Sequence, residues 1–180
     1  ENTLIGGLAG DALTTGSHNT YAGYHSGSVA TTAANNTGFG AYTLDANTSG
    51  NSNVAVGKSA LGANTTGAGN TALGLNALDA NTTASNVTAV GLNALGSNTT
   101  GAYNVAVGAS AGLALTTGAN NVVVGYEALK NEDAHGANTA IGTQALFTLN
   151  AGADAYNVAV GYQAGAAVTT GVENTLIGGL

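Results

Sequence analysis

One five-residue pattern, an Asn followed by three small or apolar residues and a Gly, recurs through the whole chain at an almost constant distance. The Gly positions lie 17 residues apart from Gly6 to Gly142, then 19 apart to Gly161, and 17 apart again to Gly178. A fixed short period is typical of stacked repeats, in which each unit buries its surface against its neighbours. The period therefore predicts a rod and argues against an enzyme with a pocket.

The two marker residues of the pattern have structural reasons to recur. Gly allows positive φ and a close approach of backbones at the corner of a coil. Asn tolerates left-handed turns, and stacked Asn amides can form a hydrogen-bonded ladder. Only one register departs from the pattern, with Val87 in the Asn position and Asn86 beside it. We assign structural repeat roles to Asn53, Gly57, Asn70, Gly74, Gly91, Asn104, Gly108, Asn121, Gly125, Asn138, Gly142, Asn157 and Gly161.

The three residues before each Gly are predicted to form a short strand. Their first and third members are mostly Thr, Val, Ile or Leu, as in Val54 and Val56, and such alternation of β-branched residues favours a strand. The middle member is mostly Ala, so both faces are apolar or small, as in a strand covered on both sides.

A second apolar segment starts three residues after the Gly, for example at Ala60-Leu61 and Ala77-Leu78, and runs into a turn such as 64–67. Seventeen residues are too few for a βαβ crossover but suffice for two short strands and two turns. Gly, Asn and Thr are weak helix formers. The predicted fold is all-β: a parallel β-roll or β-solenoid of about ten 17-residue coils, stacked about 4.8 Å apart over roughly 48 Å.

A longer repeat lies on top of the short one. Residues 1–8 and 173–180 have the same sequence, and no other unit carries this octapeptide. We interpret residues 1–180 as one repetitive segment, in which a block of 172 residues restarts at residue 173 and recurs in a longer parent protein.

Composition excludes several classes of partner. The formal net charge is −7, and Lys58 and Lys130 are the only basic side chains apart from histidine. Nucleic-acid binding needs clusters of Lys and Arg, and binding to anionic lipid needs them too, so neither is expected. No apolar run is long enough to insert into a membrane. The chain has no Cys, which excludes disulfides and thiolate metal sites.

No motif predicts catalysis or a cofactor. Gly57-Lys58-Ser59 resembles part of a phosphate loop, but Ser52 stands where that motif needs a Gly. His18, His25 and His135 lie far apart in sequence, without a nucleophile and a carboxylate arranged around them. We therefore expect no enzyme activity, no catalytic residues and no cofactor.

Two polar features each allow two interpretations. Glu132, Asp133 and Asp154 fall in or next to an irregular stretch and a two-residue insertion, where carboxylates could bind Ca²⁺. A solvated loop is the favoured reading of the same residues. Tyr24, Tyr126 and Tyr162 share the position after Gly and are expected to be exposed, either to stack on sugars or as ordinary surface cover.

The repeats resemble a known family. Residues 53–60, 104–111 and 157–161 resemble the YadA-like head repeats of trimeric autotransporter adhesins, and residues 70–78 are similar to repeats of bacteriophage tail fibres and large bacterial surface proteins. The resemblance covers essentially the whole chain, although 17 residues exceed the usual head repeat by a few. It implies a left-handed β-roll, association of three chains, adhesion at an extracellular surface and no catalytic residues. In such a trimer we expect one apolar face of the strand to fill the coil and the Ala-rich face to meet another chain.

The leading functional hypothesis is a structural segment of an extracellular fibre or adhesin, at a cell surface or on a virion, that provides a rigid rod for attachment. Its expected partners are copies of itself, as a homotrimer or fibre, and a host-surface or glycan receptor. One alternative is ice binding by an array of Thr pairs such as Thr65-Thr66, of which only one Thr per coil would face outward. The other alternative is a subunit of a functional amyloid-like fibre.

Overall fold

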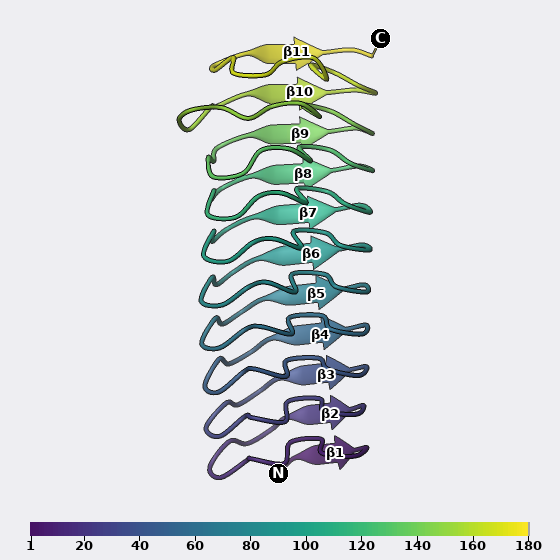
Figure 1. Cartoon of the computed structure of the whole chain (residues 1–180), viewed down its shortest axis with the longest axis vertical. Helices are drawn as coiled ribbons and strands as arrows, with labels where there is room; N and C mark the ends of the chain where they lie inside the picture. Colours follow the sequence, from purple (N-terminus) through teal and green to yellow (C-terminus); the bar gives the residue numbers. More distant parts are fainter. Residues whose placement is uncertain (180) are drawn as a thin grey trace.

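The computed structural model describes residues 1–179 as a single stack of coils in which each coil contributes one strand to a parallel sheet (Figure 1). The eleven strands follow one another in sequence order across the sheet. They are β1 Thr3–Ile5, β2 Thr20–Ala22, β3 Thr37–Phe39, β4 Val54–Val56, β5 Thr71–Leu73, β6 Thr88–Val90, β7 Val105–Val107, β8 Val122–Val124, β9 Thr139–Ile141, β10 Val158–Val160 and β11 Thr175–Ile177. The predicted β-solenoid is confirmed.

Equivalent residues stack on one another along the whole rod. Val54 of β4 pairs with Thr71 of β5, and Val56 pairs with Leu73. The 19-residue step does not disturb this register, since Val158 of β10 pairs with Thr139 of β9. The coil between β9 and β10 accommodates its two extra residues in a loop that extends away from the stack (Figure 1). The period of the sequence is therefore the period of the backbone.

The second half of each coil is a series of turns, so the prediction of a second strand there was wrong. Two residues per coil adopt left-handed backbone in this segment, as Ser59 (φ 57°) and Leu61 (φ 52°) do. The chain is still bonded to the next coil, because the N–H of Leu61 donates to the carbonyl of Ala77 at 3.1 Å. Left-handed φ values are incompatible with a strand.

The two faces of the strand are the reverse of our expectation. The Ala-rich middle column, for example Ala55 and Ala72, is fully buried inside the coil rather than facing another chain. Leu61 and Leu78, from the turn segment opposite, are also fully buried and fill the space over these Ala residues. Because side chains alternate along a strand, the larger residues on either side of each Ala must point outward.

The interior is completed by size compensation between neighbouring positions. Gly165 replaces the interior Leu in one coil, and a Cβ placed there would lie 3.5 Å from Cγ2 of Val168 and 3.0 Å from Cδ2 of Leu146. Near the N-terminus, Gly27 leaves room for the ring of Tyr21, which would lie 2.5 Å from an added Cβ. Each coil thus keeps a filled core although the residue that fills it changes.

The predicted Asn ladder runs inside the corner of the coil. The side-chain Oδ1 of Asn53 accepts the N–H of Asn70 at 2.9 Å, and its Nδ2 donates to the carbonyl of Gly67 at 2.9 Å. The Asn itself is not left-handed, contrary to one of the two reasons we gave for it. The residue before it is, as in Ser52 (φ 59°). Amide hydrogen bonds between coils, rather than turn propensity, explain why Asn recurs.

A second ladder lies in the turn at 64–67 and its equivalents, which sequence analysis treated only as a turn. Nδ2 of Asn64 donates to Oδ1 of Asn47 at 2.9 Å, and the series continues through Asn81 to Asn98. It stops there because the next residue in the column is Leu115. Oδ1 of Asn98 is consequently buried without a hydrogen-bond partner.

The break in the first ladder gives a testable prediction. Where Val87 replaces Asn, the N–H of Asn104 has no acceptor among the described residues. Val87→Asn supplies that acceptor, and its Nδ2 reaches the position from which other ladder amides donate to the turn carbonyl, here that of Gly101. We expect the free energy of unfolding to rise by about 1 kcal/mol. Thermal denaturation followed by circular dichroism should show an increase of roughly 2–4 °C, and an unchanged or lower melting temperature would contradict this account.

Candidate functional site

The outward side chains of the sheet form a continuous apolar surface, which we call the strand face. It consists of the first and third residues of β1 to β11. Every one of them is Thr, Val, Ile, Leu, Phe or Ala. Several of them are well exposed, such as Ile141 at 37%, Phe39 at 50% and Ile177 at 78%. Others, such as Val56 and Val90, are partly buried. A surface of this kind on a rod indicates an interaction site.

The geometry of the strand face follows from the in-register sheet. Like residues lie in two files along the rod, about 4.8 Å apart within a file and about 6.7 Å apart between the files. The files run unbroken past the 19-residue step, because Val160 pairs with Ile141. A strip roughly 48 Å long and 10 Å wide has an area of about 500 Å². It is long, flat and uncharged.

The exposed Tyr residues border this surface. Tyr24, Tyr126 and Tyr162 are each more than half exposed, as predicted, and each follows the strand and its Gly. Tyr24 belongs to a small aromatic group: its ring centroid lies 4.4 Å from that of His25 and 5.5 Å from that of Tyr42. Aromatic rings at the edge of an apolar strip extend the area available to a partner.

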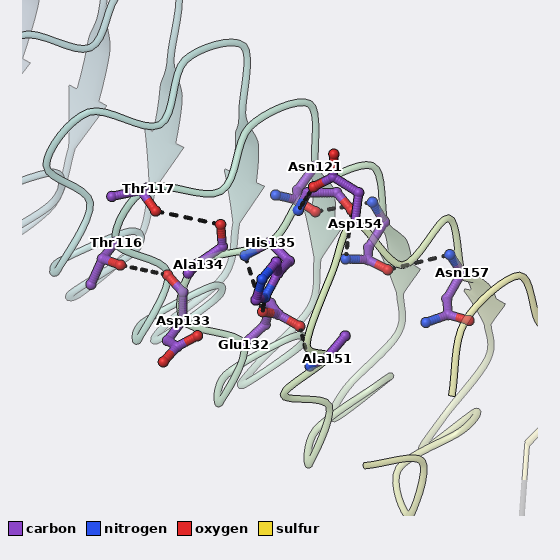
Figure 2. A network of polar contacts seen from close by, with 12 residues as sticks. Thr116, Thr117, Asn121, Glu132, Asp133, Ala134, His135, Ala151, Asp154 and Asn157 are labelled. Carbon is purple, nitrogen blue, oxygen red and sulfur yellow. Dashed lines mark hydrogen bonds and ion pairs between the residues drawn. The ribbon is translucent and has the colours of Figure 1, made fainter. Parts of the chain in front are cut away.

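The polar irregularity at 131–135 is built around a buried carboxylate (Figure 2). Glu132 is fully buried, in the column that holds Asn in other coils. Its Oε1 accepts the backbone N–H of His135 at 3.2 Å and lies 3.3 Å from His135 Nδ1, while Oε2 accepts the N–H of Ala151 at 3.0 Å. Glu132 thus ties two irregular loops together.

The structure brings together only some of the residues of the candidate cation site. Ligand atoms of Glu132, Asp133 and His135 lie within 4.8 Å of one another. Asp154 takes a different role, since its Oδ1 accepts the N–H of Gly136 at 2.8 Å (Figure 2). Because both oxygens of Glu132 already accept hydrogen bonds from the protein, its geometry is explained by loop structure, and we assign no ion to this cluster.

His25, Ser28 and Asp45 meet in space, a contact that sequence analysis did not find. Oγ of Ser28 donates to Oδ1 of Asp45 at 2.5 Å, and Nδ1 of His25 lies 3.7 Å from the same oxygen. A nucleophilic triad needs the imidazole between the hydroxyl and the carboxylate, whereas here the carboxylate lies between the other two. The arrangement therefore does not activate Ser28.

Three ionisable groups have shifted pKa values, each with a structural cause. Burial raises the pKa of Tyr21 to about 12, and burial also raises the pKa of Asp79. The hydrogen bond from Lys130 lowers the pKa of Glu127, with a second contribution from Gln144. Gln163 in turn donates to Gln144 at 2.8 Å, so these residues form a surface ladder. None of the three belongs to a convergent set of reactive groups.

No protein-family model, curated protein or solved structure matches this chain. Within residues 1–179 there is no helix long and apolar enough to cross a membrane. The strand face is the feature of the described residues that most strongly indicates an interaction.

Proposed function

We propose that this chain is a structural segment of an extracellular fibre or adhesin, of the bacterial cell-surface or phage tail-fibre type, in which three copies associate along their strand faces. The observation that carries the proposal is the unbroken apolar strand face on a rod of stacked coils. The resemblance of the repeats to adhesin heads and tail fibres supports the same conclusion.

The strand face has the properties of a surface covered by identical copies. A partner that matched its files along the whole rod would need the same spacing of about 4.8 Å, and another copy of this solenoid has it. About 500 Å² per chain corresponds to about 1,000 Å² for a pair, the lower bound for a specific interface. With outward Val, Ile and Leu and no charged residue, burial of this surface is favourable.

The stack also suits a mechanical role. Every coil from β1 to β9 is bonded to the next along its strand and along its turns, for example through Val54 N–H to Asn70 O at 2.8 Å and Ala63 N–H to Asp79 O at 2.9 Å. Bending the rod would stretch several of these bonds at once. A stiff spacer can hold a tip or a receptor-binding surface away from an anchor, and the exposed Tyr residues would offer contacts to a host-surface or glycan receptor.

Self-association is tested by measuring the native mass of the protein and of Val107→Lys. Val107 is 38% exposed in the middle of the strand face, so a buried Lys at that position opposes association without disturbing the interior of the coil. We expect a trimer for the wild type and a shift to monomer for the variant, with unchanged circular dichroism. Thr100→Lys, at an exposed position outside the strand face, is the matched control and should remain trimeric. A monomeric wild type would remove the trimer from the proposal.

Ice binding is kept as a second candidate because exposed Thr residues are regularly spaced. In the Thr pairs, the hydroxyl of the first Thr is used between coils, as Thr65 Oγ1 donates to the carbonyl of Thr82 at 2.9 Å. The second Thr, such as Thr66, is exposed, which leaves one outward hydroxyl file along that edge. Thermal hysteresis of the purified protein distinguishes the candidates. Spontaneous growth of fibres from monomers would instead favour the amyloid-like alternative.

A further inference from the structure

The coils that begin with β2 and β3 carry an aromatic group outside the strand face. It consists of Tyr24, His25 and Tyr42, which directly follow the Gly corners of these two coils. The ring centroids of Tyr24 and Tyr42 lie 5.5 Å apart with an interplanar angle of 89°, and that of His25 lies 4.4 Å from the first and 5.5 Å from the second. Tyr24 is 51% exposed and Tyr42 is 38% exposed. The rings therefore pack on one another and still offer aromatic surface to a ligand.

The other coils provide an internal reference for the second position after the Gly. Its backbone is left-handed in each coil from β1 to β10. In the coils from β4 to β10 this position holds polar residues: Ser59, Asn76, Asn93, Ser110, Glu127, Gln144 and Gln163. Tyr42, at φ 59°, places a bulky ring in a conformation that such residues rarely adopt, and more than a third of it stays exposed. The ring is thus held there at a conformational cost, which is typical of ligand sites.

A buried hydroxyl pair ties the same two coils together next to the rings. Ser26 follows His25 and Thr43 follows Tyr42, and Oγ of Ser26 lies 2.7 Å from Oγ1 of Thr43. In the coils that begin with β1 and with β4 to β10, this column holds only Ala. Gly38 makes room for the pair, since a Cβ placed there would lie 2.6 Å from the first hydroxyl oxygen and 2.8 Å from the second. The hydrogen bond fixes the residues that carry the rings, so the aromatic group is preorganised.

A carboxylate lies beside the aromatic group. Oδ1 of Asp45 accepts the hydroxyl of Ser28 at 2.5 Å and lies 3.7 Å from Nδ1 of His25. Its other oxygen, Oδ2, has no hydrogen-bond partner among residues 1–179, and the side chain is 34% exposed. Ser28 thus orients Asp45 while one oxygen stays available. Apolar ring surface with a single placed acceptor is the composition of a site for a small polar ligand.

We propose that Tyr24, His25, Tyr42 and Asp45 form a binding site for a pyranose unit of a glycan. The C–H face of the sugar ring stacks on the exposed Tyr surface, and one sugar hydroxyl donates to Oδ2 of Asp45. An organic cation fits less well, because it needs several ring faces turned toward one point, whereas these rings pack edge to face on one another. The site deepens the proposed function and rests on it, since it names the part of the rod that contacts a glycan receptor.

Saturation-transfer NMR tests the site, with the methyl glycosides of glucose, galactose, mannose, rhamnose, N-acetylglucosamine and N-acetylgalactosamine as probes. We expect transfer to at least one of them. The double variant Tyr24→Ala/Tyr42→Asn introduces residues that the repeat itself uses in these columns, at Ala41 and Asn76, so the coil is preserved. It should lower the affinity at least about tenfold. Asp45→Asn should lower it about tenfold as well, because the amide nitrogen cannot accept a hydrogen bond from the sugar hydroxyl.

Tyr103→Asn/Tyr156→Asn is the matched control. It removes two rings that are 62% and 60% exposed and lie outside the aromatic group, so the affinity should stay unchanged. An equal loss in the control overturns the proposal, and so does the absence of transfer to every one of the glycosides. Tetramethylammonium is measured in the same way. If it binds more tightly than all the glycosides and depends on Tyr24 and Tyr42, the site is one for an organic cation and the sugar assignment is overturned.

The test separates this site from association of the chains. None of the four site residues belongs to the strand face, so Val107→Lys should bind the glycosides as the wild type does. Loss of the trimer with binding retained would contradict association alone. A trimeric wild type that binds none of the glycosides would contradict the sugar site and leave the fibre role in place.

Discussion

Gly91→Ala should destabilise the rod by at least about 3–5 kcal/mol, because no L side chain fits at this corner. Gly91 has a φ of 134°, a value that residues with a Cβ rarely adopt. An added Cβ would also lie 2.5 Å from the carbonyl oxygen of Gly108 in the next coil. That oxygen belongs to the backbone of the stack and cannot move without opening the contact between β6 and β7. For a chain of this size the melting temperature should fall by roughly 6–20 °C.

The prediction for Gly91→Ala also specifies which strands lose their protection. Hydrogen exchange should show lost protection first in β6 and β7, where the stack is forced open, because solenoid coils depend on their nearest neighbours. Gly152→Ala is the matched control, since Gly152 lies in the loop between β9 and β10 and an added Cβ there meets nothing within 4 Å. We expect a change within about 0.5 kcal/mol for the control. Equal stability of the two variants would show that the Gly corner is not a constraint.

Asn53→Val should cost about 2–4 kcal/mol, because it breaks the internal Asn ladder in the middle of the rod. Val keeps nearly the same volume but leaves the N–H of Asn70 without its acceptor, which is now Oδ1 of Asn53 at 2.9 Å. The bond from Asn53 Nδ2 to Gly67 O is lost as well. Both partners lie at a fully or nearly fully buried corner, where water cannot replace the missing groups. Thermal and urea denaturation would measure the loss.

Val87 is the natural reference for this variant, because it occupies the position in its coil that Asn53 occupies at β4. Asn53→Val reproduces at β4 the break that Val87 makes at β6, so its effect should be opposite in sign to that of Val87→Asn. Thr66→Val is a suitable control, since it is a change of similar size at an exposed position whose side chain makes no hydrogen bond in the described structure. Wild-type stability in Asn53→Val would mean that the ladder amides contribute no net stability.

Much of the fold could be predicted from the sequence. The 17-residue period determined the stacking and the in-register sheet, because identical units can bury their polar backbone only by pairing like with like. Alternation at Val54, Ala55 and Val56 located a strand, and the constant Gly57 located a corner with positive φ. The contact between Ser28 and Asp45 was missed, although the two residues are 17 apart and so occupy equivalent positions in neighbouring coils.

The candidate site depended on tertiary structure. Sequence periodicity shows that Ala55 and Val56 point to opposite faces, but it does not tell which face is inside, since both are apolar. That choice follows from the opposite wall: left-handed turns carry Leu61 inward, the narrow coil then favours a small residue such as Ala55 on the inner face, and Val54 and Val56 are left outside. Glu132 is a similar case. A carboxylate in a polar stretch is expected to be exposed, but Glu132 is buried and accepts a hydrogen bond from the loop that contains Ala151.

The recurrence of the Asn and Gly pattern is a property of the sequence alone. The direction in which each side chain points became visible only when the coils were stacked, because both faces of the strand are apolar or small. Local periodicity thus determined how each coil follows the last, while packing across the coil decided which surfaces of this rod are free to bind.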